Sequence, residues 1–112
     1  MIRIKRIYDP PAPGDGRRVL VDRLWPRGVA KDDARIDEWL KEIAPSNELR
    51  KWFGHEPARL EEFRKRYREE LASQGELLER LRSEGKQGTV TLLFAAKDAE
   101  RNNAVVLKEM LD

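Results

Sequence analysis

The chain contains the run Thr89-Val90-Thr91-Leu92-Leu93-Phe94-Ala95-Ala96, which is apolar and rich in β-branched and aromatic residues. Such a run predicts a strand near the centre of a sheet, buried on both faces. A shorter run of the same kind, Val19-Leu20-Val21, lies early in the chain. Segments with helical periodicity separate the two runs. Because a crossover through helices joins parallel strands, these runs predict neighbouring parallel strands in an α/β sheet.

A third strand is predicted at residues 2–7, where apolar and polar side chains alternate. The following residues 9–16 contain three prolines and two glycines and are predicted to form a loop. The connection to the second strand is short for a parallel crossover and long for a hairpin. The pattern therefore leaves the direction of the first strand open.

Apolar spacing between and after the strands predicts five helices. The segments are 36–43, begun by Asp32 or Asp33; 46–53, capped by Ser46; 57–71; 73–85, begun by a capping box at Ser73 and closed by Gly85; and a last helix carrying Ala104, Leu107 and Leu111. We expect one α/β domain, residues 1–112. It should hold a mainly parallel sheet of about three or more strands, with helices packed around it.

Composition excludes several kinds of site. The 112 residues include no cysteine and one histidine, so disulfides, thiolate nucleophiles and multi-histidine metal sites are excluded within one chain. Asp22 and Asp98 alone would make a weak magnesium site, so we predict no metal. No apolar run approaches the roughly 18–20 residues of a membrane span, and we expect a soluble, cytoplasmic protein without membrane contact. The pattern identifies neither a cofactor nor an oligomeric state.

Charge is distributed unevenly along the chain. Residues 1–31 carry eight basic and three acidic side chains, while residues 32–112 have a net charge of −3. A nucleic-acid-binding protein more often has a basic helix face or tail. Nucleic-acid binding through the basic N-terminal third is therefore the less favoured alternative.

Polar side chains gather where the predicted strands end. In open α/β sheets, ligands bind beyond the carboxyl ends of the strands. The predicted ligand-binding residues are those that follow these ends, together with the single histidine: Tyr8, Asp22, Arg23, Trp25, Arg27, His55, Lys97, Asp98, Asn102 and Asn103. Tyr8 belongs to this set if the first strand is also parallel.

The residue types suggest an anionic ligand. Arg23, Arg27 and Lys97 would hold a carboxylate or phosphate, and Asp22 and Asp98 would orient these basic groups or a metal. Asn102 and Asn103 would direct free N–H groups of a helix start toward the anion. His55 and Asp22 are the catalytic candidates if chemistry occurs, with His55 as proton carrier.

A structural role is the alternative for each of these residues. Asp22 could pair with Lys97 or an arginine, and Trp25 could plug the edge of the sheet. A lone histidine before a helix is often a surface residue.

Three segments of the chain form a recognisable set: Asp22-Arg23-Leu24-Trp25-Pro26-Arg27-Gly28, Trp52-Phe53-Gly54-His55, and Leu92-Leu93-Phe94-Ala95-Ala96-Lys97-Asp98 with Asn102-Asn103-Ala104-Val105-Val106-Leu107. This set resembles a bacterial family, the domain-of-unknown-function family 488, in its YeaO-like branch. The resemblance implies a compact α/β domain and no established activity. Other branches place a helix between the first two strands, which favours a parallel first strand.

Two further implications follow from the resemblance. Other branches carry a Cys-His-Arg string where this chain has Asn102-Asn103-Ala104, so thiol chemistry does not transfer. Some members carry names that suggest transcriptional regulation, and segments 36–43 and 46–53 could mimic a helix-turn-helix. We expect a small anionic or phosphate-bearing ligand at the carboxyl edge, with or without catalysis. A protein-interaction module without chemistry is a further alternative.

Overall fold

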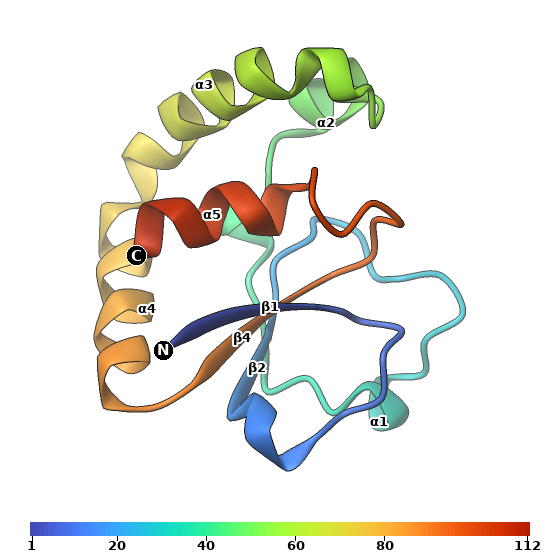
Figure 1. Ribbon diagram of the computed structural model, residues 1–112, viewed down its shortest axis with the longest axis vertical. Coiled ribbons are helices and arrows are strands. Elements are labelled where there is room, and N and C mark those ends of the chain that lie inside the picture. Colours follow the sequence, from blue (N-terminus) through green and yellow to red (C-terminus); the bar gives the residue numbers. More distant parts are fainter.

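In the computed structural model, strand β4, Val90–Phe94, lies inside a four-stranded parallel sheet with the order β1-β4-β2-β3 (Figure 1). Its neighbours are β1, Ile2–Arg6, and β2, Arg17–Leu20, and all five of its residues are buried. Ile4 of β1 pairs with Leu92, which pairs on its other side with Val19 of β2. The parallel pairing predicted for the two apolar runs is confirmed. The first strand is parallel as well, so the carboxyl ends of β1, β2 and β4 lie at one edge.

The predicted helix at 36–43 is wrong. The chain forms a short helix α1, Lys31–Ala34, then the edge strand β3, Glu38–Trp39, and a 3-10 turn η2, Lys41–Ile43. Two backbone bonds dock this segment on β2, from Asp37 N to the Arg18 oxygen at 2.8 Å and from Leu40 N to the Leu20 oxygen at 2.9 Å. Without them the outer edge of β2 would keep unpaired backbone groups, and satisfying those groups outweighs a weak helical periodicity.

The other helices lie close to their predicted positions. They are α2, Asn47–Phe53; α3, Leu60–Leu71, after the 3-10 turn η3, Pro57–Arg59; α4, Gly75–Gln87, after the turn η4, Ala72–Gln74; and α5, Asn103–Leu111. Ser46 caps α2 as predicted, by accepting a hydrogen bond from Leu49 N, and Gly54 ends the helix in the left-handed conformation.

Two local predictions fail. The Ser73 hydroxyl bonds back to the Glu70 oxygen instead of capping α4. Gly85 does not close α4, because it lies inside that helix where an added Cβ would come within 2.5 Å of the Ile2 side chain. The proline-rich loop contains a 3-10 turn η1, Pro13–Asp15, since buried Asp15 binds the Ala12 N–H.

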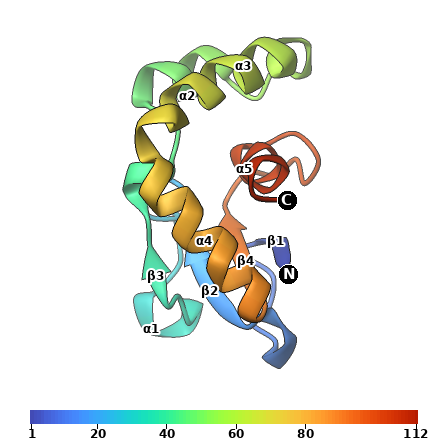
Figure 2. The ribbon, with the colours of Figure 1, turned by 90° about the vertical axis from the view of Figure 1, so that its left-hand side faces the viewer.

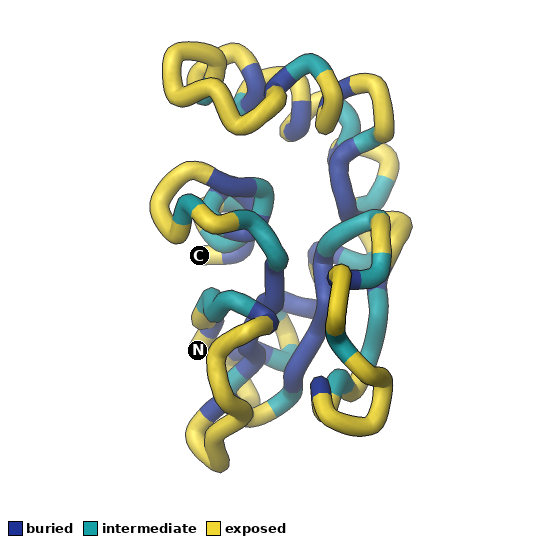
Figure 3. The backbone as a smooth tube through the Cα atoms, turned by 90° about the vertical axis from the view of Figure 1, so that its right-hand side faces the viewer, coloured by how far each residue is buried: buried dark blue, intermediate teal, exposed yellow.

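Helices α4 and α5 pack against one face of the sheet, whereas α2 and α3 lie together at the far end of the molecule, above α5 in Figure 2. The segment 22–37 packs against part of the other face. The main core lies between the helices and the Val19, Leu92 and Phe94 side of the sheet, and a smaller cluster contains Leu20 and Leu93. Figure 3 shows buried residues concentrated in the strands and on inner helix faces. The structure describes residues 1–112 as one α/β domain. None of its helices is long and apolar enough to span a membrane.

Candidate functional site

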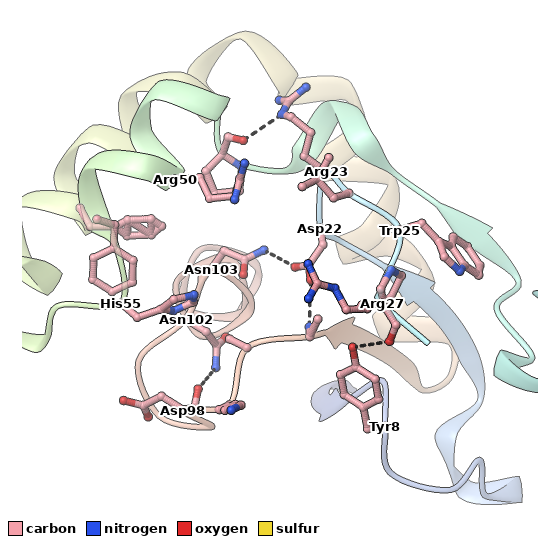
Figure 4. Close-up of a pocket in the computed structure, with 18 residues that line it drawn as sticks. Tyr8, Asp22, Arg23, Trp25, Arg27, Arg50, His55, Asp98, Asn102 and Asn103 are labelled. Carbon is pink, nitrogen blue, oxygen red and sulfur yellow. Dashed lines mark hydrogen bonds between the residues drawn. The ribbon is translucent and has the colours of Figure 1, made fainter. Parts of the chain in front are cut away.

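A cavity of about 710 Å³ lies at the carboxyl edge of the sheet. One wall comes from the segments that follow β1, β2 and β4 and from the start of α5, and the opposite wall comes from α2, the turn after it, and α3 (Figure 4). All ten residues that the sequence predicted to bind a ligand line this cavity: Tyr8, Asp22, Arg23, Trp25, Arg27, His55, Lys97, Asp98, Asn102 and Asn103. The parallel sheet explains the convergence, while the binding role of each residue stays a prediction.

Asp22 lies where β2, β4 and α5 meet. Its carboxylate accepts hydrogen bonds from Ala95 N at 2.9 Å and from the Asn103 side-chain amide at 3.2 Å. Burial raises the pKa of Asp22 above its ordinary value, although these hydrogen bonds and the charges of Arg50 and His55 act in the opposite direction. No lysine, arginine or histidine forms an ion pair with it, so the alternative of a structural bridge to Lys97 is wrong.

The loop after Asp22 is held by side-chain to backbone bonds. The Trp39 indole donates a hydrogen bond to the backbone carbonyl oxygen of Asp22, and the Trp25 indole donates one to that of Val29, each at 2.7 Å. The two indole rings pack edge to face with centroids 5.3 Å apart. Trp25 therefore has a structural role, as the alternative interpretation expected, and also lines the cavity. The Tyr8 hydroxyl donates to the Arg27 oxygen at 2.9 Å. The loop therefore presents its side chains from a constrained backbone.

Arg23 differs from its predicted role. Its guanidinium donates to the Pro45 oxygen at 3.0 Å and to the Ala44 oxygen at 3.2 Å, and Figure 4 shows it directed toward this segment (residues 44–45). These bonds tie the loop after β2 to the segment that leads into α2. Arg23 therefore offers a ligand little of its hydrogen-bonding capacity.

Asp98 and Asn102 also serve the local structure. Asp98 accepts bonds from the Glu100 and Arg101 N–H groups and pairs with the Arg101 guanidinium at 3.1 Å. The hydrogen bond from Glu100 is the main reason that the pKa of Asp98 lies below its ordinary value. Asn102 is 2% exposed. Its side-chain oxygen caps α5 by accepting a hydrogen bond from Val105 N, and its side-chain nitrogen donates to the backbone carbonyl oxygen of Asp98. Asp98 therefore does not orient the basic groups of the cavity as predicted, and the Asn102 side chain itself binds an N–H group of the α5 start.

Three cations of the cavity have no partner in the protein. Arg27, Arg50 and Lys97 are exposed, and the side chain of none of them donates a hydrogen bond or forms an ion pair. Arg27 and Lys97 follow β2 and β4, whereas Arg50 comes from α2 on the opposite wall (Figure 4). Positive charge that the fold does not use is thus concentrated around one cavity.

The whole chain, residues 1–112, matches a family model described as "Inactive DUF488-N3 subclade". The chain belongs to the DUF488 family. It is 48% identical over 110 residues to "Uncharacterized protein YeaO" of Escherichia coli strain K12, covering 98% of this chain and 96% of that protein. An uncharacterized protein of Mycobacterium tuberculosis is 45% identical over 111 residues, covering 99% of this chain and 93% of the relative. No solved structure matches the chain.

His55 is poorly placed for catalysis in this DUF488 protein. It is exposed, has the left-handed backbone angle φ of 59°, and its ring lies 6.1 Å from the Phe53 ring without a hydrogen bond. A catalytic imidazole is usually oriented by a second group that fixes its tautomer. The "Inactive" description of the subclade agrees with this geometry.

The structure adds cavity residues that sequence reasoning missed. They are Leu24, Pro26, Pro45, Arg50, Phe53, Phe63, Ala95 and Ala96. The sequence held no local signal for Arg50, because it reaches the cavity only through the placement of α2 opposite the edge of the sheet. Phe53 and Phe63 stack with centroids 4.4 Å apart, which gives the DUF488 cavity an apolar inner wall. No three acidic, histidine or cysteine side chains are grouped as metal ligands.

Proposed function

We propose that this DUF488 protein binds a small anionic ligand in the cavity without converting it chemically. The observation that carries the proposal is the set of three cations, Arg27, Arg50 and Lys97, that line one cavity and have no internal partner. The two guanidinium groups suit a carboxylate or phosphate because their planar N–H groups can bind two oxygens at once. A bound anion would also reduce the repulsion among the three cations.

The backbone around Arg27 favours binding. Pro26 restricts the chain on one side, and Gly28, at φ 77°, makes the turn on the other. The Tyr8 hydroxyl fixes the Arg27 carbonyl between them. Since this backbone is already ordered, binding costs less conformational entropy than it would on a free surface loop.

The placement of the other basic residues argues against nucleic acid as the ligand. Arg18 is buried against Asp15 and two carbonyl oxygens, and Lys5 pairs with Asp15 at 3.1 Å. Arg17 pairs with Glu38 and Glu84. Three of the eight basic side chains of the N-terminal third are therefore paired with carboxylates inside the fold. A helix-turn-helix over 36–53 is also absent, because its first helix does not form.

Thermal melts at constant ionic strength test the proposal. Inorganic phosphate or citrate should raise the melting temperature of the wild type in a saturable way, whereas added chloride should not. Arg27→Ala and Arg50→Ala should each weaken binding by about 1.5–3 kcal/mol, the scale of a hydrogen bond to a charged group. Arg68→Ala is the matched control, because Arg68 is half exposed on α3 and lies outside the cavity.

Two results would contradict the proposal. One is a wild type that neither anion stabilises. The other is an anion effect that Arg68→Ala reduces as much as Arg27→Ala does. Binding of DNA or RNA whose affinity falls steeply with salt would favour the nucleic-acid alternative instead.

A further inference from the structure

We infer that the ligand of the cavity is a purine nucleoside monophosphate of the guanine type, whose base donates N–H groups to Asp22 and whose phosphate lies among the three cations. The inference rests on the proposed function and specifies the ligand class. It depends on features of the cavity that anion binding alone leaves unexplained: a carboxylate without an ion pair and two exposed apolar side chains.

The first feature is Asp22. An anion site gains nothing from a carboxylate in its lining, because that charge repels the ligand. Each oxygen of a carboxylate has two acceptor sites, and Asp22 uses one on each oxygen, for Ala95 N and for the Asn103 amide. One acceptor site per oxygen is left for a ligand, and these sites suit two adjacent N–H donors.

The second feature is the exposed apolar surface. The exposed large apolar side chains of the protein are Met1, Tyr8 at 45% and Leu24 at 57%, and the last two line this cavity. The Tyr8 ring is immobilised, since its hydroxyl binds the Arg27 oxygen and the Arg6 guanidinium carbon lies 5.1 Å from the ring centroid. A fixed aromatic ring of this kind is a stacking surface for a flat heterocycle.

The third feature is the balance of charge and size. Three cations, Arg27, Arg50 and Lys97, line the cavity. Of the two carboxylates in the lining, Asp98 is paired with Arg101, so only Asp22 lacks an ion pair. This balance suits the double negative charge of one phosphate. The cavity volume of about 710 Å³ lies within the range of roughly 300–1,000 Å³ that is usual for small-molecule sites.

These features together select guanine among the common purines. Guanine presents an N1–H and a 2-amino group side by side, which match the two open acceptor sites of Asp22. Adenine has an acceptor at N1, which would face the carboxylate without a hydrogen atom between them. A buried acceptor left without its donor is penalised strongly, and this penalty is the source of selectivity.

Affinities of the full-length protein for four probes test the inference: guanosine 5′-monophosphate, adenosine 5′-monophosphate, ribose 5-phosphate and guanosine. Calorimetric titration of the wild type should give a preference of about 10- to 100-fold for the guanine nucleotide over the adenine nucleotide. Ribose 5-phosphate and guanosine should each bind more weakly than the guanine nucleotide, because each lacks one of the two anchors.

Variants separate the two anchors. Asp22→Asn should bring the guanine-to-adenine ratio close to one while ribose 5-phosphate binds at least as tightly as before, since a repulsive charge is removed. Asp33→Asn, at an exposed position on α1, should leave the ratio unchanged. A melt of each variant without ligand shows whether it folds, and the ratio in the wild type tests the inference even if Asp22→Asn does not fold.

The outcomes distinguish this inference from the proposed function. Equal binding of all three phosphates with loss in Arg27→Ala would overturn the guanine assignment and leave anion binding intact. Binding of citrate but of no phosphate would do the same. Absence of any anion binding would overturn both.

Discussion

Arg23 and Arg27 are four residues apart in the same loop, yet the structure gives them opposite roles. Arg23 is half buried and donates to the Ala44 and Pro45 oxygens, both of which belong to buried residues. Arg23→Ala removes two hydrogen bonds from a charged donor and leaves two carbonyl groups without their partner. Each such bond contributes at most about 1.5–3 kcal/mol, and partial exposure reduces this, so we expect a loss of about 2 kcal/mol in the free energy of unfolding.

This loss corresponds to a fall of about 8 °C in melting temperature, taking about 4 °C per kcal/mol for a domain near this size. Arg23→Lys should recover less than half, because one ammonium group reproduces a planar fork poorly. Arg27→Ala should stay within about 0.5 kcal/mol of the wild type, because the Arg27 side chain has no partner and Tyr8 binds the backbone oxygen that alanine retains. Urea and thermal denaturation of the three variants measure these values. Equal losses for Arg23→Ala and Arg27→Ala would refute the division of roles.

Three further changes test the fold by urea denaturation. Asp15→Ala should cost about 3–5 kcal/mol at pH 7, because it leaves the Arg18 guanidinium buried without its carboxylate. Burial opposes ionisation of Asp15, but hydrogen bonds from Ala12, Lys5 and Arg18 outweigh this effect and keep the pKa of Asp15 below its ordinary value. The ionised carboxylate therefore stabilises the fold above pH 3.8, and this stabilisation is lost as the pH falls through the lowered pKa. The free-energy cost of Asp15→Ala should accordingly shrink in acid. Gly16→Ala should cost about 3 kcal/mol or more, since φ is +62° and the new Cβ would lie 2.2 Å from the Thr89 oxygen; a near-neutral result would contradict this geometry. Asn102→Ala should cost about 2 kcal/mol by removing the cap of α5, and an unchanged midpoint would contradict that role.

The sheet and its carboxyl edge were predictable because a strand buried on both faces has an almost entirely apolar sequence. Residues 90–94 are buried at every position, so the run is apolar throughout, and 19–21 follows the same rule. The crossover rule then makes the strands parallel and brings Asp22 and Lys97 to one edge. The wall of the cavity at the sheet edge followed from these two steps, whereas the wall formed by α2 and α3 did not.

The edge strand β3 was not predictable from local pattern. The spacing of Ile36, Trp39, Leu40 and Ile43 suits one face of a helix, but an edge strand followed by a tight turn buries the same side chains. The strand forms in place of the helix because it supplies hydrogen-bond partners to the backbone groups at the outer edge of β2. The sequence of residues 36–43 carries no information about those groups.

The roles of individual site residues also lay beyond sequence reasoning. Nothing in the residue types distinguishes Arg23, which binds carbonyl oxygens, from Arg27, which binds none. Likewise Arg50 reaches the cavity only because the chain places α2 across from the sheet edge. Tertiary placement decides which polar groups the fold uses and which it leaves for a ligand.

Chemical-shift mapping of the ¹⁵N-labelled protein tests the claim of a cavity for small anions most directly. The protein would be titrated with phosphate and, separately, with citrate at constant ionic strength. We predict saturable shifts of the amides of residues 23–25, 27–28, 50–55 and 95–98, which belong to the facing walls of the cavity, and no comparable shifts on the outer face of α3 or on α4. Shifts spread over the charged surface without saturation, or none in the cavity with either anion, would contradict the account.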